Sequence, residues 1–290
     1  MNAFSLRACA KINVGLEVIR KRPDGYHDIQ SIFVGIDLHD TLEIEEADTQ
    51  EVVCIPPVTD SPNENLVSKA MKLYASTFPS ENHGAKITVR KRIPTGGGLG
   101  GGSSDAATAL LAMAMINGHT LSPLIIQLLT PLAEKLGSDV PFFLHAGISL
   151  VEGRGEHITP LHISFPWTIL LICPGIHIDT AMAYSTLGIR GEQVKDNLVD
   201  KFVQLLDNNS LNGEDLRNDF EPRIFELNPI LANVKARLHD QGAIFSSMSG
   251  RGSTMFGLFT SVDNAEKARS AFAEMDTYIC HPVNASFMTP

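Results

Sequence analysis

Cysteine is scarce in this chain of 290 residues. The four cysteines, Cys9, Cys54, Cys173 and Cys280, lie far apart in the sequence, and no two of them form a C-x-x-C pair. Such isolated cysteines are typical of reduced, small apolar residues in a cytoplasmic protein. Their spacing argues against a disulfide scaffold and against a structural zinc site.

Long apolar runs and an excess of basic residues are also lacking. The N-terminus, "MNAFSLRACAKINV", has no basic segment followed by an apolar run, so we expect no signal peptide. No stretch is long and apolar enough to span a bilayer. Lysine and arginine total 23 against 33 acidic residues, giving a net charge of -10. This balance predicts a cytoplasmic protein with a small-molecule partner, and no binding to nucleic acid or membranes. It predicts no particular oligomeric state.

The pattern of the chain predicts an α+β fold. Segments with strand and helix character are mixed but do not alternate strictly, which disfavours a doubly wound sheet. The length allows two domains, and we predict a boundary that separates residues 1–163 from 164–290. Strands are expected at 4–22, 30–36, 40–47, 85–93, 147–153, 167–174, 243–250, 253–259 and 277–282. Helices are expected at 62–78, 103–117, 122–137, 178–187 and 228–242.

The most informative stretch is "RKRIPTGGGLGGGSSDAATALLAMAM", in which six of the seven residues from Gly96 to Gly102 are glycine. A strand ending at Pro94 precedes this loop. A helix follows it, with Ser103, Ser104 and Asp105 as N-cap and first-turn residues. Glycine amides can approach phosphate oxygens without obstruction by side chains, and a helix N-terminus favours anions. We therefore predict a phosphate-binding loop made of Pro94, Thr95, Gly96, Gly97, Gly98, Leu99, Gly100, Gly101, Gly102, Ser103 and Ser104.

Three other interpretations of the loop are weaker. Gly96, Gly98 and Gly101 form a G-x-G-x-x-G pattern, but after Asp105 the next acidic residue is Glu134, so the ribose ligand of a dinucleotide site is missing. A Walker A loop needs a lysine before its serine or threonine, and the signatures H-R-D and D-F-G of protein kinases are absent. A flexible linker would have no reason to join a strand to a capped helix.

The segment "PTGGGLGGGSSDAA" resembles the phosphate loop of the GHMP kinases, a superfamily named for galactokinase, homoserine kinase, mevalonate kinase and phosphomevalonate kinase. The stretches "AKINVGLEVIRKRPDGYHDI", "GSDVPFFL", "GRGE", "NDFE" and "MSGRGSTMFGLF" are similar to one branch of it, in order, from Cys9 to about Phe259. That branch uses ATP and Mg²⁺ to phosphorylate the 2-hydroxyl of the methylerythritol part of a cytidine diphosphate sugar alcohol, in non-mevalonate isoprenoid biosynthesis. The resemblance implies an N-terminal unit like ribosomal protein S5 domain 2, a C-terminal α/β sandwich, and an active site in the cleft between them.

The resemblance also implies a catalytic pair. Lys11 lies among apolar residues in "AKIN" and needs a partner, because a buried unpaired ammonium is costly. The family places its catalytic aspartate at Asp139, where the alternative is a helix N-cap. Asp139 would accept the proton of the acceptor hydroxyl, and Lys11 would keep it ionised and offset charge in the transition state.

The remaining site residues come from the same resemblance. Asn13, Tyr26, His27, Ile178, Thr180 and Tyr184 are expected to bind the cytidine substrate, and Asn65 to contact the adenosine of ATP. Four alternatives stay open: Asn13 as a strand-end polar residue, Tyr26 and His27 as an exposed pair in a turn, Tyr184 as a core aromatic, and Asn65 as a plain N-cap. No dedicated metal ligands are predicted; Ser103, Ser104 and water are candidates for holding Mg²⁺.

Three further segments or positions are also interpreted from the sequence. "MSGRGST", Met248 to Thr254, is expected to be a hairpin turn beside the site, with Arg251 where the family usually has Ser or Thr. Gly97 stands where Ala is common, and "NDFE", Asn218 to Glu221, is expected to cap a helix without a chemical role.

Competing functions are a GHMP kinase for homoserine or mevalonate and a non-catalytic nucleotide-binding protein. The "DGYH" turn disfavours the first, and the presence of both Lys11 and Asp139 disfavours the second.

Overall fold

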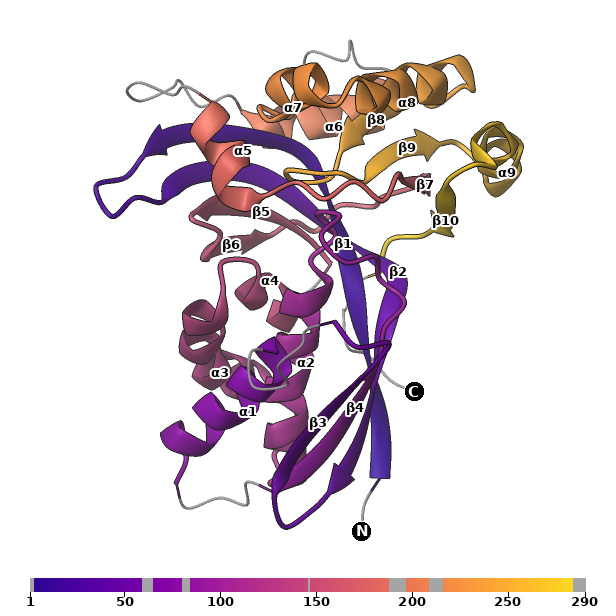
Figure 1. The fold of residues 1–290 in the computed structure, drawn as a ribbon. Coiled ribbons are helices and arrows are strands. Elements are labelled where there is room, and N and C mark those ends of the chain that lie inside the picture. Colours follow the sequence, from indigo (N-terminus) through magenta and orange to yellow (C-terminus); the bar gives the residue numbers. More distant parts are fainter. Residues whose placement is uncertain are drawn as a thin grey trace.

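Two β-sheets with helices packed on them make up the chain, which confirms the α+β class (Figure 1). The computed structural model describes residues 3–58, 65–79, 84–145, 147–187, 197–208 and 216–283. The first sheet contains β1 (Ala3–Lys21), β2 (His27–Glu46), β3 (Gln50–Ile55), β4 (Ala85–Arg90), β5 (Ile148–Gly153) and β6 (His157–Pro160). Its order is β3-β4-β2-β5-β6, with β1 also paired to β2. The second contains β7 (Thr168–Cys173), β8 (Phe245–Met248), β9 (Met255–Phe259) and β10 (Asp276–Cys280), in the order β10-β7-β9-β8.

The strands β1 and β2 form one long antiparallel hairpin that connects the two halves of the molecule, drawn in indigo and violet in Figure 1. Its open end contributes Leu6 and Leu42 to the core beneath the first sheet. Its turn end contributes Leu16 and Val18 to the core of the C-terminal half. Prediction of two separate strands at 30–36 and 40–47 was wrong, because the apolar alternation continues through Leu38 and β2 runs unbroken for 20 residues.

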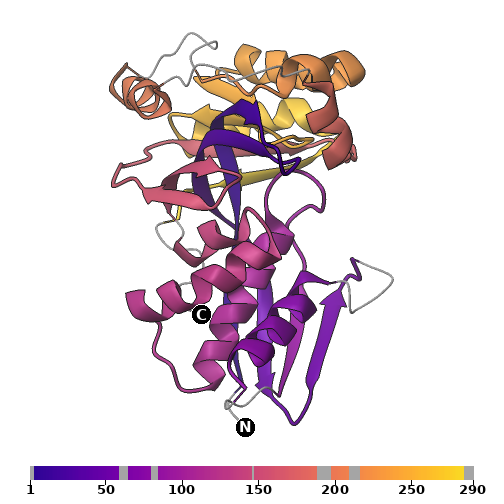
Figure 2. The ribbon, with the colours of Figure 1, turned by 90° about the vertical axis from the view of Figure 1, so that its left-hand side faces the viewer.

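Four helices cover one face of the first sheet (Figure 2). They are α1 (Leu66–Thr77), α2 (Gly101–Ile116), α3 (Pro123–Leu136) and α4 (Val140–His145). The helix α2 packs against β1 and β2 on one side and against the other three helices on the other. Its residues from Ser104 to Ala114 are all buried, as expected for a helix surrounded by neighbours. The glycine loop that precedes α2 is thus attached to a rigid, central element.

The second sheet carries the C-terminal helices α5 (Thr180–Thr186), α6 (Leu198–Asn208), α7 (Glu221–Leu227), α8 (Pro229–Asp240) and α9 (Val262–Arg269), and a 3-10 turn at Ser270–Phe272. All six residues of β7 are buried, as the apolar run predicted. The strands β8 and β9 are antiparallel neighbours joined by a tight turn, which confirms the predicted hairpin. The first sheet ends at Pro160 and the second begins at Thr168; the domain boundary at 163 and 164 stays a prediction. Among the described helices, none has the length and apolar character that crossing a membrane requires.

Candidate active site

The route into the glycine loop is set by a buried ion cluster. The strand β4 ends at Arg90, before the expected Pro94. The backbone N–H groups of Arg92 and Ile93 donate to Asp40 Oδ1, at 2.5 and 2.9 Å, and so leave the strand ladder. Lys91 turns inward, with Nζ 2.5 Å from Asp40 Oδ2 and 2.6 Å from Asp105 Oδ2. One ammonium thus forms ion pairs with two buried carboxylates. Burial, together with the negative charge of Asp40, raises the pKa of Asp105 to about 7.

The helix α2 begins at Gly101, two residues earlier than predicted, and its N-cap is Gly100. Gly100 has φ 75°, in the left-handed region, and turns the chain directly into the helix. Ser103, Ser104 and Asp105 therefore lie within the helix and do not cap it. Ser103 lines the cavity described below, whereas Ser104 is fully buried and does not line it.

The loop is held firmly by its neighbours. Lys11 N donates to Leu99 O (3.0 Å), and from the β8–β9 turn Thr254 N donates to Gly97 O (3.2 Å) and Ser249 Oγ to Gly98 O (3.0 Å). At Gly98 φ is +80°, and a Cβ there would lie 3.0 Å from the Ser249 carbonyl carbon and closer still to its oxygen. The loop is therefore no flexible linker, and at least this glycine is required by close backbone approach.

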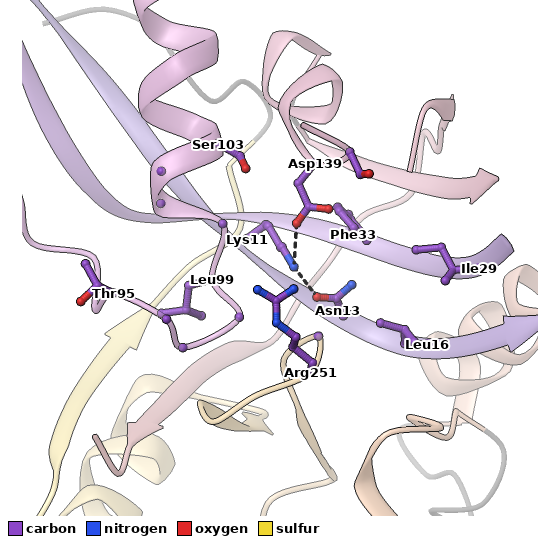
Figure 3. A pocket seen from close by; sticks show the side chains of 18 of the residues that line it. Lys11, Asn13, Leu16, Ile29, Phe33, Thr95, Leu99, Ser103, Asp139 and Arg251 are labelled. Carbon is purple, nitrogen blue, oxygen red and sulfur yellow. Dashed lines mark hydrogen bonds and ion pairs between the residues drawn. The ribbon is translucent and has the colours of Figure 1, made fainter. Parts of the chain in front are cut away.

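A cavity of about 1050 Å³ opens between the two halves of the molecule (Figure 3). The loop from Pro94 to Ser103 forms one wall, Lys11 and Asn13 on β1 lie at its centre, and Asp139 faces them. Tyr184 on α5 and Arg251 in the β8–β9 turn come from the C-terminal half. The site thus combines residues far apart in sequence, in the predicted cleft.

Lys11 and Asp139 form the central ion pair. Lys11 is 3% exposed; its Nζ lies 3.5 Å from Asp139 Oδ2 and donates to Asn13 Oδ1 at 2.6 Å. Burial lowers the pKa of Lys11, the Asp139 charge opposes that effect, and the Arg251 charge adds to it. The Asp139 side chain is 32% exposed, so it is open to the cavity. Asn13 Nδ2 in turn donates to Ser31 Oγ (3.0 Å), which fixes the amide.

The aromatic residues predicted for the substrate also meet at the cavity. The rings of His27 and Tyr184 are stacked, with centroids 4.7 Å apart and an interplanar angle of 19°. Burial, then the Lys21 charge, lowers the pKa of His27, and burial raises the pKa of Tyr184 to about 12. Tyr26 is 54% exposed, with the Arg154 guanidinium 4.9 Å from its ring centroid. Tyr184 is thus a cavity wall as well as a packed aromatic.

Three predicted residues are placed differently. Ile178 is buried in the C-terminal core and does not line the cavity. Thr180 begins α5, and its side chain lies outside the described residues. Asn65 borders the cavity, but its side chain caps α1: Oδ1 accepts from Val67 N at 2.8 Å, and Nδ2 donates to Cys54 Sγ at 2.9 Å. The plain N-cap interpretation of Asn65 is confirmed, and contact with adenosine stays a prediction.

The prediction that "NDFE" caps a helix is confirmed in part, but its side chains also hold the β8–β9 turn. Asn218 Oδ1 accepts from Phe220 N at 3.0 Å at the start of α7, although the N-cap residue itself is Phe220. Asn218 Nδ2 donates to Met248 O (2.8 Å) and Gly250 O (2.6 Å), and Glu221 Oε1 accepts from Met248 N (2.8 Å). These side chains hold the β8–β9 turn in place. In the sequence, the signal for holding the turn was the polar residues Asn218 and Glu221 on either side of Phe220. The sequence alone does not distinguish this pattern from a helix cap.

Comparisons with known proteins show the family to which this fold belongs. Residues 65–147 match the family described as "GHMP kinases N terminal domain", and residues 194–276 match "GHMP kinases C terminal". Together the two matches span more than half of the chain. The fold and the cavity therefore define a small-molecule kinase of the GHMP class.

Comparison with individual proteins identifies a particular family within this class. The chain is 38% identical over 285 residues to a 4-diphosphocytidyl-2-C-methyl-D-erythritol kinase of Thermodesulfovibrio yellowstonii, with 97% of each chain covered. A crystal structure of 4-(cytidine 5'-diphospho)-2C-methyl-D-erythritol kinase has a TM-score of 0.81 at 31% identity, covering 96% of this chain and 98% of that one. A homoserine kinase from Cytophaga hutchinsonii shares the fold, with a TM-score of 0.75 at 19% identity and 99% and 97% coverage. The chain belongs to the 4-diphosphocytidyl-2-C-methyl-D-erythritol kinase family.

Proposed function

We propose that this enzyme transfers the γ-phosphoryl group of ATP to the 2-hydroxyl of 4-diphosphocytidyl-2-C-methyl-D-erythritol, in the non-mevalonate route to isoprenoid precursors. The observation that carries the proposal is the Lys11–Asp139 pair, at 3.5 Å, in one cavity with the glycine loop and the stacked rings of His27 and Tyr184. This arrangement supplies a donor site, an acceptor site and a base in one space.

In the proposed reaction Asp139 accepts the proton of the 2-hydroxyl as the oxygen attacks the γ-phosphorus. The bond from that phosphorus to the bridging oxygen breaks, and ADP leaves. Lys11 pairs with the Asp139 carboxylate and directs a buried positive charge at the reacting groups, where low exposure strengthens it. Asn13 fixes the Lys11 ammonium and is in position to donate to the acceptor.

The loop from Gly96 to Ser103 fits a triphosphate. Gly102, in the first turn of α2, lines the cavity, and a Cβ there would make only ordinary contact, 3.6 Å from Leu66 Cδ1, so the backbone is accessible at this position. The free N–H groups at the start of this 16-residue helix favour bound phosphate. Within the described residues no cluster of three acidic, histidine or cysteine side chains could hold a metal. Mg²⁺ would therefore be held by phosphate oxygens, water and Ser103, and would neutralise charge on the phosphates.

The acceptor end of the cavity suits a cytosine. Tyr184 and His27 offer flat faces, Tyr26 lies at the opening, and the Arg154 guanidinium beside Tyr26 can pair with a diphosphate. Neither homoserine nor mevalonate needs such aromatic surfaces. We also propose that the enzyme acts in the cytoplasm, in line with its four free cysteines.

The test is acceptor-dependent ADP release. Purified protein is mixed with ATP, Mg²⁺ and, separately, the cytidyl substrate, homoserine and mevalonate. We expect ADP release only with the cytidyl substrate, and the product should carry a new phosphate monoester. ADP release with one of the other alcohols would favour a different GHMP kinase activity, and nucleotide binding without turnover would favour a binding protein.

A further inference from the structure

Arg251 lies at the tip of the β8–β9 turn, and its side chain extends into the cavity toward Lys11 and Asn13 (Figure 3). Among the described residues, no side chain or carbonyl forms a hydrogen bond or ion pair with its guanidinium. A half-buried guanidinium without a partner is costly unless a ligand supplies the missing acceptors. The cavity position points to an anionic ligand.

The electrostatics lead to the same conclusion. The positive charge of Arg251 lowers the pKa of the buried Lys11, so the two cations are close enough to repel each other. One carboxylate, Asp139, faces both of them. The pair of cations therefore leaves an uncompensated positive charge at the centre of a cavity in a chain of net charge -10. A bound anion would offset this repulsion.

The backbone that carries Arg251 is fixed between the donor and acceptor sites. A Cβ at Gly250 would lie 3.3 Å from Asn13 Oδ1, 3.6 Å from Lys11 Nζ and 3.6 Å from Gly98 O. Asn218 holds the same turn by its bond to Gly250 O. Gly250, beside Arg251, thus lies close to both the glycine loop and Lys11, with little room for a side chain of its own.

We propose that Arg251 donates to the non-bridging oxygens of the γ-phosphoryl group as it transfers, and stabilises its charge in the transition state. The inference rests on the function proposed above. Arg251 keeps its proton throughout, because the hydroxyl proton goes to Asp139 and ADP leaves with the electrons of the broken bond. A planar guanidinium suits this task, because its parallel N–H groups match two phosphoryl oxygens. The acceptor diphosphate is assigned to Arg154, which lies against Tyr26 at the aromatic end.

The experiment compares Arg251→Ser and Arg251→Lys with the wild type, using Arg269→Ser on the exposed face of α9 as the matched control. For Arg251→Ser we expect kcat to fall about 100-fold, with the KM for ATP and for the acceptor changed less than about threefold. Arg251→Lys should recover part of the rate. The control should match the wild type, and melting temperatures should agree within about 2 °C for all four proteins. A kcat for Arg251→Ser within threefold of the wild type, or a loss confined to the KM of the acceptor, would overturn the assignment.

A binding measurement separates this inference from the proposed function. Affinity for ADP is measured by calorimetry with and without aluminium fluoride, which mimics the transferring phosphoryl group. We expect fluoride to tighten ADP binding in the wild type and to do so much less in Arg251→Ser, while ADP alone binds both equally. Equal tightening in the two proteins would refute the role of Arg251. This result is readable even if the cytidyl substrate proves not to be the acceptor, which the wild-type turnover assay decides by itself.

Discussion

Replacing Gly98 by alanine is the sharpest test of the loop geometry. Gly98 has φ +80°, and an added Cβ would lie 3.0 Å from the Ser249 carbonyl carbon and 3.3 Å from Gly252 O, with the Ser249 oxygen nearer still. Backbone atoms, unlike flexible side-chain ends, cannot rotate away. The β8–β9 turn or the loop must therefore shift, and such a shift would stretch the bond from Ser249 Oγ to Gly98 O, which is 3.0 Å long.

The expected cost has two parts. A left-handed backbone costs a residue with a Cβ roughly 1–2 kcal/mol. Overpacking against fixed atoms costs typically about 1–3 kcal/mol more. The free energy of unfolding should therefore fall by about 2–5 kcal/mol, which corresponds to a melting temperature lower by roughly 5–15 °C. ATP affinity should fall as well, because the displaced loop carries the phosphate-binding amides.

Substitutions at two other glycines separate the cost of the left-handed backbone from the cost of overpacking. Gly118 has φ +78° with no atom within 4 Å of an added Cβ, so Gly118→Ala should show only the backbone cost. Gly102 lies within a helix, where alanine should leave the melting temperature unchanged or raise it. Thermal melting and calorimetric titration with an ATP analogue measure both effects. If Gly98→Ala melts no lower than Gly118→Ala and binds the analogue as the wild type does, the close approach has no energetic weight and the reasoning fails.

Three further predictions concern single side chains of the cavity. Asp139→Asn should lower kcat at least about 1000-fold with an unchanged melting temperature, and near-normal ADP release would end its assignment as the base. The pKa of Asp105 is about 7 in the fold against 3.8 as its ordinary value, so the contribution of this carboxyl to stability is fully present below pH 3.8 and is lost as pH rises to 7. Asp105→Asn should therefore change the free energy of unfolding more favourably at pH 8 than at pH 5, by at most about 3 kcal/mol, because each of the two pKa units between pH 5 and pH 7 corresponds to about 1.4 kcal/mol. Equal effects in denaturant titrations at the two pH values would contradict this. Tyr184→Leu should raise the KM of the acceptor about 10-fold to 100-fold by removing the stack with His27, with the KM of ATP unchanged, and Tyr184→Phe serves as the control.

The sequence predicted the glycine loop, its following helix and the buried strand β7 because each has a strong local signal: repeated glycine, an apolar run, or a run bounded by proline. Boundaries were less accurate where long-range contacts decide them. The strand β4 ends at Arg90 because Asp40, fifty residues earlier, captures the next backbone N–H groups. The helix α2 starts early because Gly100 adopts a left-handed conformation that allows entry to the helix without a side-chain cap. Neither cause is visible in a local window.

The site residues likewise include some that sequence motifs predicted and some that only long-range contacts reveal. Lys11 and Asp139 were expected from family motifs, and the structure brings them together; their roles remain proposals. Lys91, which holds two carboxylates beside the loop, was missed because each partner is remote in sequence. Asn218 was assigned to a helix cap because its residue type is common there. Its Oδ1 does accept from Phe220 N, but its Nδ2 donates to Met248 O and Gly250 O, which lie 30 and 32 residues away in sequence.

The position of Asn218 explains how the strand that carries Lys11 and the turn that carries Arg251, far apart in sequence, share one frame. The segment beside it is bound to the strand that carries Lys11: Leu16 N donates to Arg217 O, and Asp219 N donates to Leu16 O, each at 2.9 Å. The same segment holds the turn that carries Arg251. Hydrogen bonds therefore link all three elements, because the Asn218 side chain bonds to Gly250 O beside Arg251 and Lys11 N bonds to Leu99 O in the glycine loop. Such a frame fixes the reacting groups before substrates arrive, which is how positioning lowers the barrier of a reaction that demands little covalent chemistry from the protein. Loss of the Asn218 side chain should therefore lower kcat more than it weakens ATP binding.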